Sequence, residues 1–359
     1  MSLLWCDGFD HYGILGNLTE GAWAQNNGNC TLVTTNPRTG THHLRHAGNS
    51  SQAGLQRRVL GGAKTTVGLA GVFYLSSLPS TNDRFCPFVF NDAANANQVT
   101  IVIQSTGVIE AKRGSRTGTS LGVSASPAVT AEAYQHIECM VFFSQTVGTV
   151  EVRVNGVTVL SISGADTVAT SLVECSQVVF FSSSESGLNT ETTVPQADLD
   201  DVFCYDSAGS FNNTFIGDRR VLTLFPNADT IQADWTPVGA ANGYDCINDT
   251  TPDGDTTYIT ASVPGSPGPI SEFGIENLPA GISAISAVVL VEMARKTEAG
   301  DANTQWSVVS GASETAGADK PLTEVYTYRQ DVFETDPASA APFTPSEVDA
   351  LLIKVERTA

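Results

Sequence analysis

The stretch GTVEVRVNG, residues 148–156, decides the fold class of this chain. Its valines alternate with polar residues, and it ends in the pair Asn155-Gly156. Alternation with a period of two is typical of a strand that buries one face. Asn-Gly at the end of such a run predicts a type I′ turn, because both central residues of that turn need positive φ. The stretch therefore predicts one arm and the turn of a β-hairpin.

Similar strand-like runs recur along the first part of the chain. Residues 136–143 read as a strand, and residues 199–206 read as a short strand that begins in carboxylates and ends in a turn. Turn residues such as Asn and Gly separate the runs about every ten positions. Many short strands at this spacing predict an all-β sandwich.

The chain changes character after residue 207. Residues 208–235 begin as a polar, turn-prone stretch and continue as a strand that Pro226 stops. Residues 236–359 carry strand patterns of their own. We therefore expect a sandwich domain over 1–207, a linker or connecting strand over 208–235, and a smaller β-rich domain over 236–359 that serves docking or oligomerisation.

Charge and hydropathy exclude several classes of partner. The chain has 359 residues, with 18 Lys and Arg against 38 Asp and Glu, so its formal net charge is −20. Phosphate backbones repel such a chain, so we expect no nucleic-acid partner. No stretch approaches the roughly 18 apolar residues of a membrane span, and the N-terminus lacks the features of a signal peptide. We expect no membrane insertion, and synthesis in a cytoplasm.

Three segments together carry a family resemblance: residues 134–141, 148–156 and 199–205. They are similar to the concanavalin A-like lectin/glucanase and laminin G group, in which a Trp-His-Ile/Val-Glu strand precedes a V-x-V-N-G hairpin and a late D-D-V strand. Tyr134 stands where the group usually has Trp. The resemblance covers roughly residues 1–207 and implies a concanavalin A-like jelly roll, a fold that either binds or cuts glycans. The smaller β-rich C-terminal domain would follow it.

Other segments resemble virion proteins of tailed bacteriophages: residues 6–12, residues 40–45 and much of the chain after residue 210. This resemblance implies a structural protein of the tail or fibre, the collar or the head decoration, located in the virion after synthesis in the host cytoplasm. Its partners would be other virion proteins, a host-surface glycan and further copies of the chain, with a trimer favoured.

The sequence argues against catalysis by a known motif. Glucanases of the jelly-roll group present Glu-x-Asp-x-(x)-Glu, which places the acids on one face of a strand. Here Asp198 and Asp200 share a face, but no glutamate follows. We therefore expect a non-enzymatic protein that displays a lectin-like domain. The alternatives are a glycan depolymerase of the glycoside hydrolase type and an architectural protein that binds no sugar.

Two sets of candidate site residues follow. The carboxylates of Asp198, Asp200 and Asp201 form a candidate calcium site, since Ca²⁺ takes six to eight oxygen ligands. The alternative, which we favour, is that Asp200 or Asp201 accepts backbone N–H bonds in a turn. No other cofactor is expected. For sugar binding, which uses aromatic rings beside polar groups, the candidates are Tyr12, Tyr74, Asn91, Asp92 and Arg113.

Overall fold

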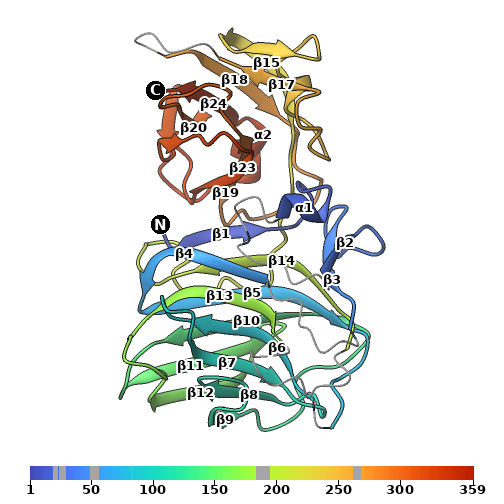
Figure 1. Cartoon of the computed structure of the whole chain (residues 1–359), viewed down its shortest axis with the longest axis vertical. Coiled ribbons are helices and arrows are strands. Elements are labelled where there is room, and N and C mark those ends of the chain that lie inside the picture. The colour runs from blue at the N-terminus through green and yellow to red at the C-terminus, as the bar shows by residue number, and fades with distance from the viewer. Residues whose placement is uncertain (19–22, 24–29, 49–55, 82, 183–194, 262–267) are drawn as a thin grey trace.

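The computed structural model describes the chain except residues 19–22, 24–29, 49–55, 82, 183–194 and 262–267. It confirms the predicted class: nearly all regular structure is β, arranged as a sandwich followed by a smaller β-rich part. Figure 1 shows the sandwich below and the C-terminal strands above, with β1 lying between them. Within the described residues, no helix is both long enough and apolar enough to cross a membrane.

The first layer of the sandwich is an eight-stranded antiparallel sheet, which we call sheet A. Its order is β12-β11-β10-β5-β14-β3-β2, and β1 also pairs with β14. The strands are β1 (Leu3–Asp7), β2 (Cys30–Val33), β3 (His43–His46), β5 (Thr66–Leu75), β10 (Tyr134–Phe142), β11 (Gly148–Val154), β12 (Val157–Ala165) and β14 (Ala197–Tyr205). A four-residue helix, α1 (Leu15–Leu18), lies between β1 and β2 in the chain.

The second layer, sheet B, has six strands in the order β4-β13-β6-β7-β8-β9. They are β4 (Gln56–Lys64), β6 (Phe85–Asn91), β7 (Asn97–Ile103), β8 (Ile109–Arg113), β9 (Thr119–Val123) and β13 (Cys175–Ser182). Phe73 of sheet A and Phe88 of sheet B meet edge to face with ring centroids 5.5 Å apart, and both are buried in one continuous core. The alternation seen in the sequence is therefore the alternation between this core and the outer faces.

The hairpin that the sequence predicts at residues 148–156 is present. Asn155 has a φ of 49° and Gly156 a φ of 79°, as a type I′ turn requires. Val150 and Val152 are buried in the core. The register of β11 with β10 places Val152 opposite Cys139. The turn residues and the buried valines thus fix which face of the hairpin points inward.

Strand β14 carries an irregularity that the sequence did not indicate. The pairing of β14 with β5 shifts between Asp200 and Phe203, and Asp201 has a φ of 49°. The other edge of β14 pairs first with β3 and then, after this bulge, with β1. One strand thereby connects both β1 and β3 to the middle of sheet A.

The C-terminal part contains a six-stranded sheet, sheet C, and two two-stranded sheets. Sheet C has the order β15-β18-β24-β20-β21, with β22 also paired to β20. Its strands are β15 (Pro226–Ala233), β18 (Ile270–Ile275), β20 (Asn303–Ser310), β21 (Ser313–Ala316), β22 (Lys320–Pro321) and β24 (Leu352–Arg357). The small sheets pair β16 (Thr236–Val238) with β17 (Tyr258–Thr260), and β19 (Val288–Ala294) with β23 (Thr327–Phe333). The remaining elements are η1 (Tyr244–Cys246) and α2 (Pro345–Asp349).

The predicted connection over residues 208–235 has two structural parts. Its second part contains β15, which pairs with β18 inside sheet C. Its first part crosses the outer face of sheet A, where the Glu138 carboxylate accepts the backbone N–H groups of Ile216 at 2.8 Å and Gly217 at 3.0 Å. Because β15 belongs to sheet C, the C-terminal fold begins near residue 226.

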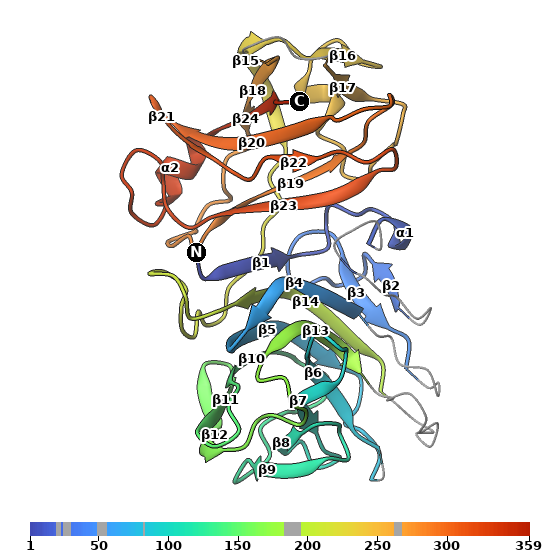
Figure 2. The ribbon, with the colours of Figure 1, turned by 60° about the vertical axis from the view of Figure 1, so that its left-hand side comes forward.

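Strand β1 and strand β23 join the two parts of the chain, as Figure 2 shows. The Glu334 carboxylate accepts the backbone N–H groups of Ser2 at 2.9 Å and Leu3 at 3.0 Å. Arg58 of the sandwich donates to Gln330 of β23 at 2.7 Å. These buried polar contacts span more than 270 positions in sequence, so the two parts form one packed unit.

Candidate functional site

A row of polar and aromatic side chains crosses the outer face of sheet A. Residues that lie directly opposite each other on paired strands share a face of the sheet. Tyr134 lies opposite Tyr74, Tyr74 opposite Asp198, and Asp198 opposite Arg45. Thr31 of β2 lies opposite Arg45 and extends the row to a fifth strand. With strands about 4.8 Å apart, the row is about 19 Å long.

The exposed members of this row, which we call the tyrosine–arginine row, are the two tyrosines, Arg45 and Thr31. Tyr74, Tyr134 and Arg45 are half-buried, and Thr31 is exposed. The rings of Tyr74 and Tyr134 lie 5.5 Å apart and are tilted by 55°. The Tyr134 hydroxyl donates to the backbone carbonyl of Asn36 at 2.8 Å, which fixes that ring.

Asp198 positions the arginine of the row. Arg45 donates from Nε to Oδ1 at 2.6 Å and from Nη2 to Oδ2 at 2.8 Å, a bidentate pair that leaves Nη1 outside it. The Nε2 atom of the buried His43 lies 3.3 Å from the same carboxylate. Burial opposes ionisation of Asp198, but the hydrogen bonds from Arg45 and His43 outweigh it and lower its pKa. The Arg45 pKa is raised, chiefly by its hydrogen bond to Asp198.

Next to the row, a loop and the connection between the two parts of the chain cover the same face of sheet A. Asp200 accepts the backbone N–H groups of Arg38 at 2.9 Å and Thr39 at 3.0 Å. Asp201 accepts from the Arg38 guanidinium at 2.6 Å and from the backbone N–H of Val221 at 2.7 Å. The loop that contains Arg38 and the connection that contains Val221 therefore meet at these two carboxylates.

Burial beneath this loop and connection shifts the pKa values of two acids and one histidine. Burial, with the neighbouring Asp201 carboxylate, raises the pKa of Asp200 to about 8. Burial also raises the pKa of Asp201. Burial lowers the pKa of His136 to about 4, so its imidazole is neutral at pH 7. His136 lies opposite Val72, which lies opposite Asp200, so the three form the next buried rung of the sheet.

Each of the three candidate calcium ligands already accepts hydrogen bonds from other parts of the chain. Asp198 receives Arg45, Asp200 receives two backbone N–H groups of the loop, and Asp201 receives Arg38 and Val221. Among the residues that the structure describes, no group of three or more His, Cys, Asp or Glu side chains is arranged to hold a metal ion. Calcium binding at these carboxylates stays a prediction.

Of the five sugar-binding candidates, the structure places one, Tyr74, in the row. Tyr12 is fully buried, donates to Asp7 at 2.7 Å and packs 5.0 Å from the Tyr328 ring of β23. A ring with no exposed face cannot stack on a sugar in this conformation.

Asn91, Asp92 and Arg113 lie on the other layer, at one end of sheet B. Asp92 is buried and accepts the backbone N–H groups of Ala94 and Ala96, both at 2.9 Å, so it closes the turn after β6. Arg113 forms an ion pair with Asp166. The five candidates therefore do not form one site.

Three residues of the row were missing from the sequence-based set: Thr31, Arg45 and Tyr134. A signal for Arg45 existed, because alternation along residues 42–46 places His43 and Arg45 on one face. The partner of that face, Asp198, lies 153 positions away in the sequence. Alternation within one strand cannot identify a neighbour at that distance.

Comparison with known proteins gives fold-level matches only. No family model matches the chain, and no curated protein matches it significantly. Among solved structures, the alginate lyase Aly36B matches with a TM-score of 0.38 and 12% identity, over 57% of this chain and 96% of that one. The alginate lyase vAL-1 from Chlorella virus matches with a TM-score of 0.37 and 14% identity, over 50% and 90%.

A sialidase matches with a TM-score of 0.40 and 11% identity, over 56% of this chain and 18% of that chain. The match therefore spans less than a fifth of the sialidase. At these identities and TM-scores the likeness concerns the β-sandwich and assigns no activity.

These matches correct one sequence-based expectation. The chain was predicted not to be an enzyme, because it lacks the glucanase pattern of acids. That conclusion is wrong: the matched structures include enzymes, namely alginate lyases and a sialidase. The absence of one acidic motif is therefore no ground for excluding catalysis. The virion location, the trimer and the other virion partners stay predictions from the sequence, as does the specific concanavalin A-like relationship.

Proposed function

We propose that this chain engages a glycan along the tyrosine–arginine row of sheet A. The observation that carries the proposal is the register that places Tyr134, Tyr74, Asp198 and Arg45 side by side on adjacent strands. Sugars have apolar C–H faces and hydroxyl groups. Half-exposed tyrosines offer an amphipathic ring surface on which the C–H faces can stack. A fixed guanidinium offers hydrogen-bond donors to the hydroxyl groups.

The row is also pre-organised. The Tyr134 ring is held by its hydrogen bond to Asn36, and Arg45 is held by the bidentate contact with Asp198. Groups that are already fixed lose little conformational entropy when a ligand binds. This property supports recognition of a ligand as weakly hydrophobic as a sugar.

A second candidate function, depolymerisation of the bound glycan, has an observation of its own. Asp198 and Asp200 lie two residues apart on one face of β14, and their environments move their pKa values in opposite directions. Glycoside hydrolysis commonly uses one ionised and one protonated carboxyl group in this way. Both groups are nearly fully buried, so the loop with Arg38 and Thr39 would have to move before a substrate could reach Asp200.

Binding to a panel of immobilised neutral and acidic polysaccharides tests the first proposal. Truncating Tyr74 or Tyr134 to alanine should weaken binding about 2- to 10-fold each, the equivalent of about 0.5–1.5 kcal/mol per aromatic contact. The matched control is Tyr258→Ala, a half-buried tyrosine of the C-terminal part. Equal affinity for the chain and both row variants would refute the assignment.

The same preparations test depolymerisation through the release of new chain ends. If the unmodified chain releases ends and Asp200→Asn does not, while both bind equally, the second candidate is supported. Binding without release at any pH from 4 to 9 would reject it and leave recognition alone.

A further inference from the structure

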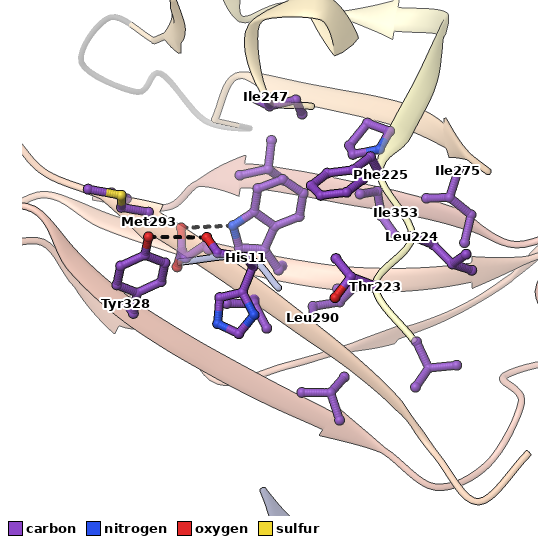
Figure 3. A pocket seen from close by; sticks show the side chains of 18 of the residues that line it. His11, Thr223, Leu224, Phe225, Ile247, Ile275, Leu290, Met293, Tyr328 and Ile353 are labelled. Atoms are coloured by element: carbon purple, nitrogen blue, oxygen red, sulfur yellow. Dashed lines mark hydrogen bonds between the residues drawn. The ribbon is translucent and has the colours of Figure 1, made fainter. Parts of the chain in front are cut away.

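A large cavity lies between the C-terminal part and the N-terminal segment of the chain, and its lining includes none of the tyrosine–arginine row. Its volume is about 1070 Å³. Strands β18, β20 and β24 of sheet C form one wall, the two-stranded sheet of β19 and β23 forms another, and residues 218–226 of the connection border it. Figure 3 shows side chains from these elements around the hollow.

Much of the lining that Figure 3 labels is apolar. Leu224, Phe225, Ile275 and Leu290 are half-buried, and Ile353 is 8% exposed. Core side chains of the sandwich, in contrast, are almost fully buried. The half-buried lining shows that the hollow is partly open to solvent, unlike the close-packed core of the sandwich. An apolar molecule in the cavity would remove this surface from water.

One polar atom at the cavity lacks a partner. His11 lines the cavity, and its Nε2 atom is buried with no hydrogen-bond partner among the residues that the structure describes. Its ring lies 4.1 Å from the Tyr12 ring and 5.7 Å from the Tyr328 ring, so its position is fixed. A buried polar atom without a partner is costly, and a ligand group that bonds to it removes that cost.

A second polar group of the cavity lining, the Glu292 carboxylate, already has hydrogen-bond partners. Glu292 of β19 accepts from Trp306 Nε1 at 2.8 Å and from the Thr304 hydroxyl at 3.1 Å, and it pairs with Arg329 at 2.5 Å. Elsewhere the lining carries acidic and basic side chains in similar numbers. The cavity therefore has no field that selects a charged ligand, and burial keeps His11 neutral by lowering its pKa.

We propose that this cavity binds an uncharged amphiphile with an elongated apolar body and a single hydroxyl or carbonyl end that bonds to His11 Nε2. The volume suits a small organic molecule, and an apolar lining with few polar contacts is the usual construction of such sites. This inference is independent of glycan binding at sheet A, because it uses different residues and a different ligand class.

The uncharged fluorophore 1,6-diphenyl-1,3,5-hexatriene, which has no hydrogen-bonding group, and the competitor dodecan-1-ol test the proposal on the full chain. We expect saturable fluorescence enhancement and its reversal by dodecan-1-ol. His11→Phe keeps a ring of similar size but removes the polar contact, so it should weaken dodecan-1-ol about 3- to 10-fold, the value of one hydrogen bond. The fluorophore, which needs no such bond, should bind His11→Phe as it binds the unmodified chain.

Filling the cavity gives a second test. Leu290→Trp should abolish fluorophore binding, whereas the matched control Leu172→Trp, at a 38% exposed leucine of the sandwich, should not. Should Leu290→Trp fail to fold, 11-bromoundecan-1-ol on the unmodified chain replaces it. Trp235 and Trp306 line the cavity, so their fluorescence should be quenched saturably, while Trp5 and Trp23 are buried in the sandwich core.

Three results would overturn the proposal. The first is the absence of both enhancement and quenching in the monomer. The second is a Leu290→Trp variant that folds and binds the fluorophore unchanged. The third is an oligomer, seen by sedimentation, that excludes the fluorophore and that Leu290→Trp dissociates, since a second copy of the chain would then cover the cavity. None of these measurements involves a polysaccharide, so they succeed or fail separately from the glycan assays.

Discussion

Replacing Asp198 by asparagine should destabilise the sandwich and do so in a pH-dependent way. Asp198→Asn keeps the shape of the side chain but removes the charge that holds Arg45 by two hydrogen bonds of 2.6 and 2.8 Å. A hydrogen bond to a charged group contributes about 1.5–3 kcal/mol. The Arg45 side chain is 27% exposed, so water replaces part of that loss. We expect a net loss of about 2–3 kcal/mol in the free energy of unfolding.

For a domain of about 200 residues, each kcal/mol shifts the Tm by about 2–4 °C, so Asp198→Asn should lower it by about 4–12 °C at pH 7. The pKa of Asp198 is lowered in the folded chain. A depressed pKa contributes stability above the unfolded value, near 3.9, and that stability is lost as the pH falls through the folded value. The difference between the two proteins should therefore be full at pH 7 and shrink below about pH 4.

Near-ultraviolet circular dichroism during heating, at pH 7 and at pH 3, measures both effects. The matched control is Asp166→Asn, since Asp166 also pairs with an arginine of the sandwich but both side chains are more than a third exposed. An exposed pair contributes about 0–1 kcal/mol, so the control should change the Tm by little. If the two variants lose the same stability at pH 7, or if the Asp198→Asn difference is the same at both pH values, the account of the row is wrong.

Three further perturbations test other contacts of the fold. Glu334→Ala removes the acceptor of the Ser2 and Leu3 N–H groups and should lower the free energy of unfolding in urea by about 3 kcal/mol. The control Glu324→Ala, at an exposed position, should lower it by less than about 0.5 kcal/mol. Gly68→Ala would place Cβ 2.1 Å from the Tyr205 ring and should cost about 1–3 kcal/mol, while Gly16→Ala, whose Cβ would meet nothing closer than 3.9 Å, should be tolerated; equal stability of these two variants would contradict the packing. Burial lowers the pKa of His136 to about 4, so its titration costs up to about 3 kcal/mol as the pH falls from 6.5 to 4, whereas Asp200, whose pKa is raised to about 8, contributes a slope of opposite sign. The difference in free energy of unfolding between His136→Phe and the unmodified chain should therefore change by about 3 kcal/mol between pH 6.5 and 4 in urea titrations, and a constant difference would contradict the account of His136.

The sequence predicted the faces of individual strands well, because alternation reports burial directly. Consecutive residues of β3 alternate between the two faces: Leu44 lies in the core, while Arg45 pairs with Asp198 on the outer face. Asp198 and Asp200 do share the outer face of β14, as their spacing required. The turn predicted at Asn155-Gly156 is present, and both residues have positive φ.

The candidate site could not be assembled in the same way, for two physical reasons. First, alternation along a strand does not predict which distant strand pairs with it. The contact of Arg45 with Asp198 could therefore not be predicted from the sequence. Second, an outer face can be covered by another part of the chain. Tyr12 was a sugar-binding candidate because it is aromatic, yet its ring is buried and Tyr328 of β23 packs against it. Alternation predicts which residues of a strand face the core and which face outward. It does not predict which outward-facing residues are exposed to solvent.

The outer face of sheet A is divided, and this division limits how a glycan could lie on it. At one end of the sheet, Ala70, Phe203 and Tyr205 pack with Val332 of the C-terminal part. In the middle, the rung that includes His136 and Asp200 is buried. The tyrosine–arginine row, by contrast, is half-buried to exposed. Because the row runs across the strands, an extended sugar chain would have to cross β10, β5, β14, β3 and β2 in turn, which makes the strand register the feature that sets the order of its contacts.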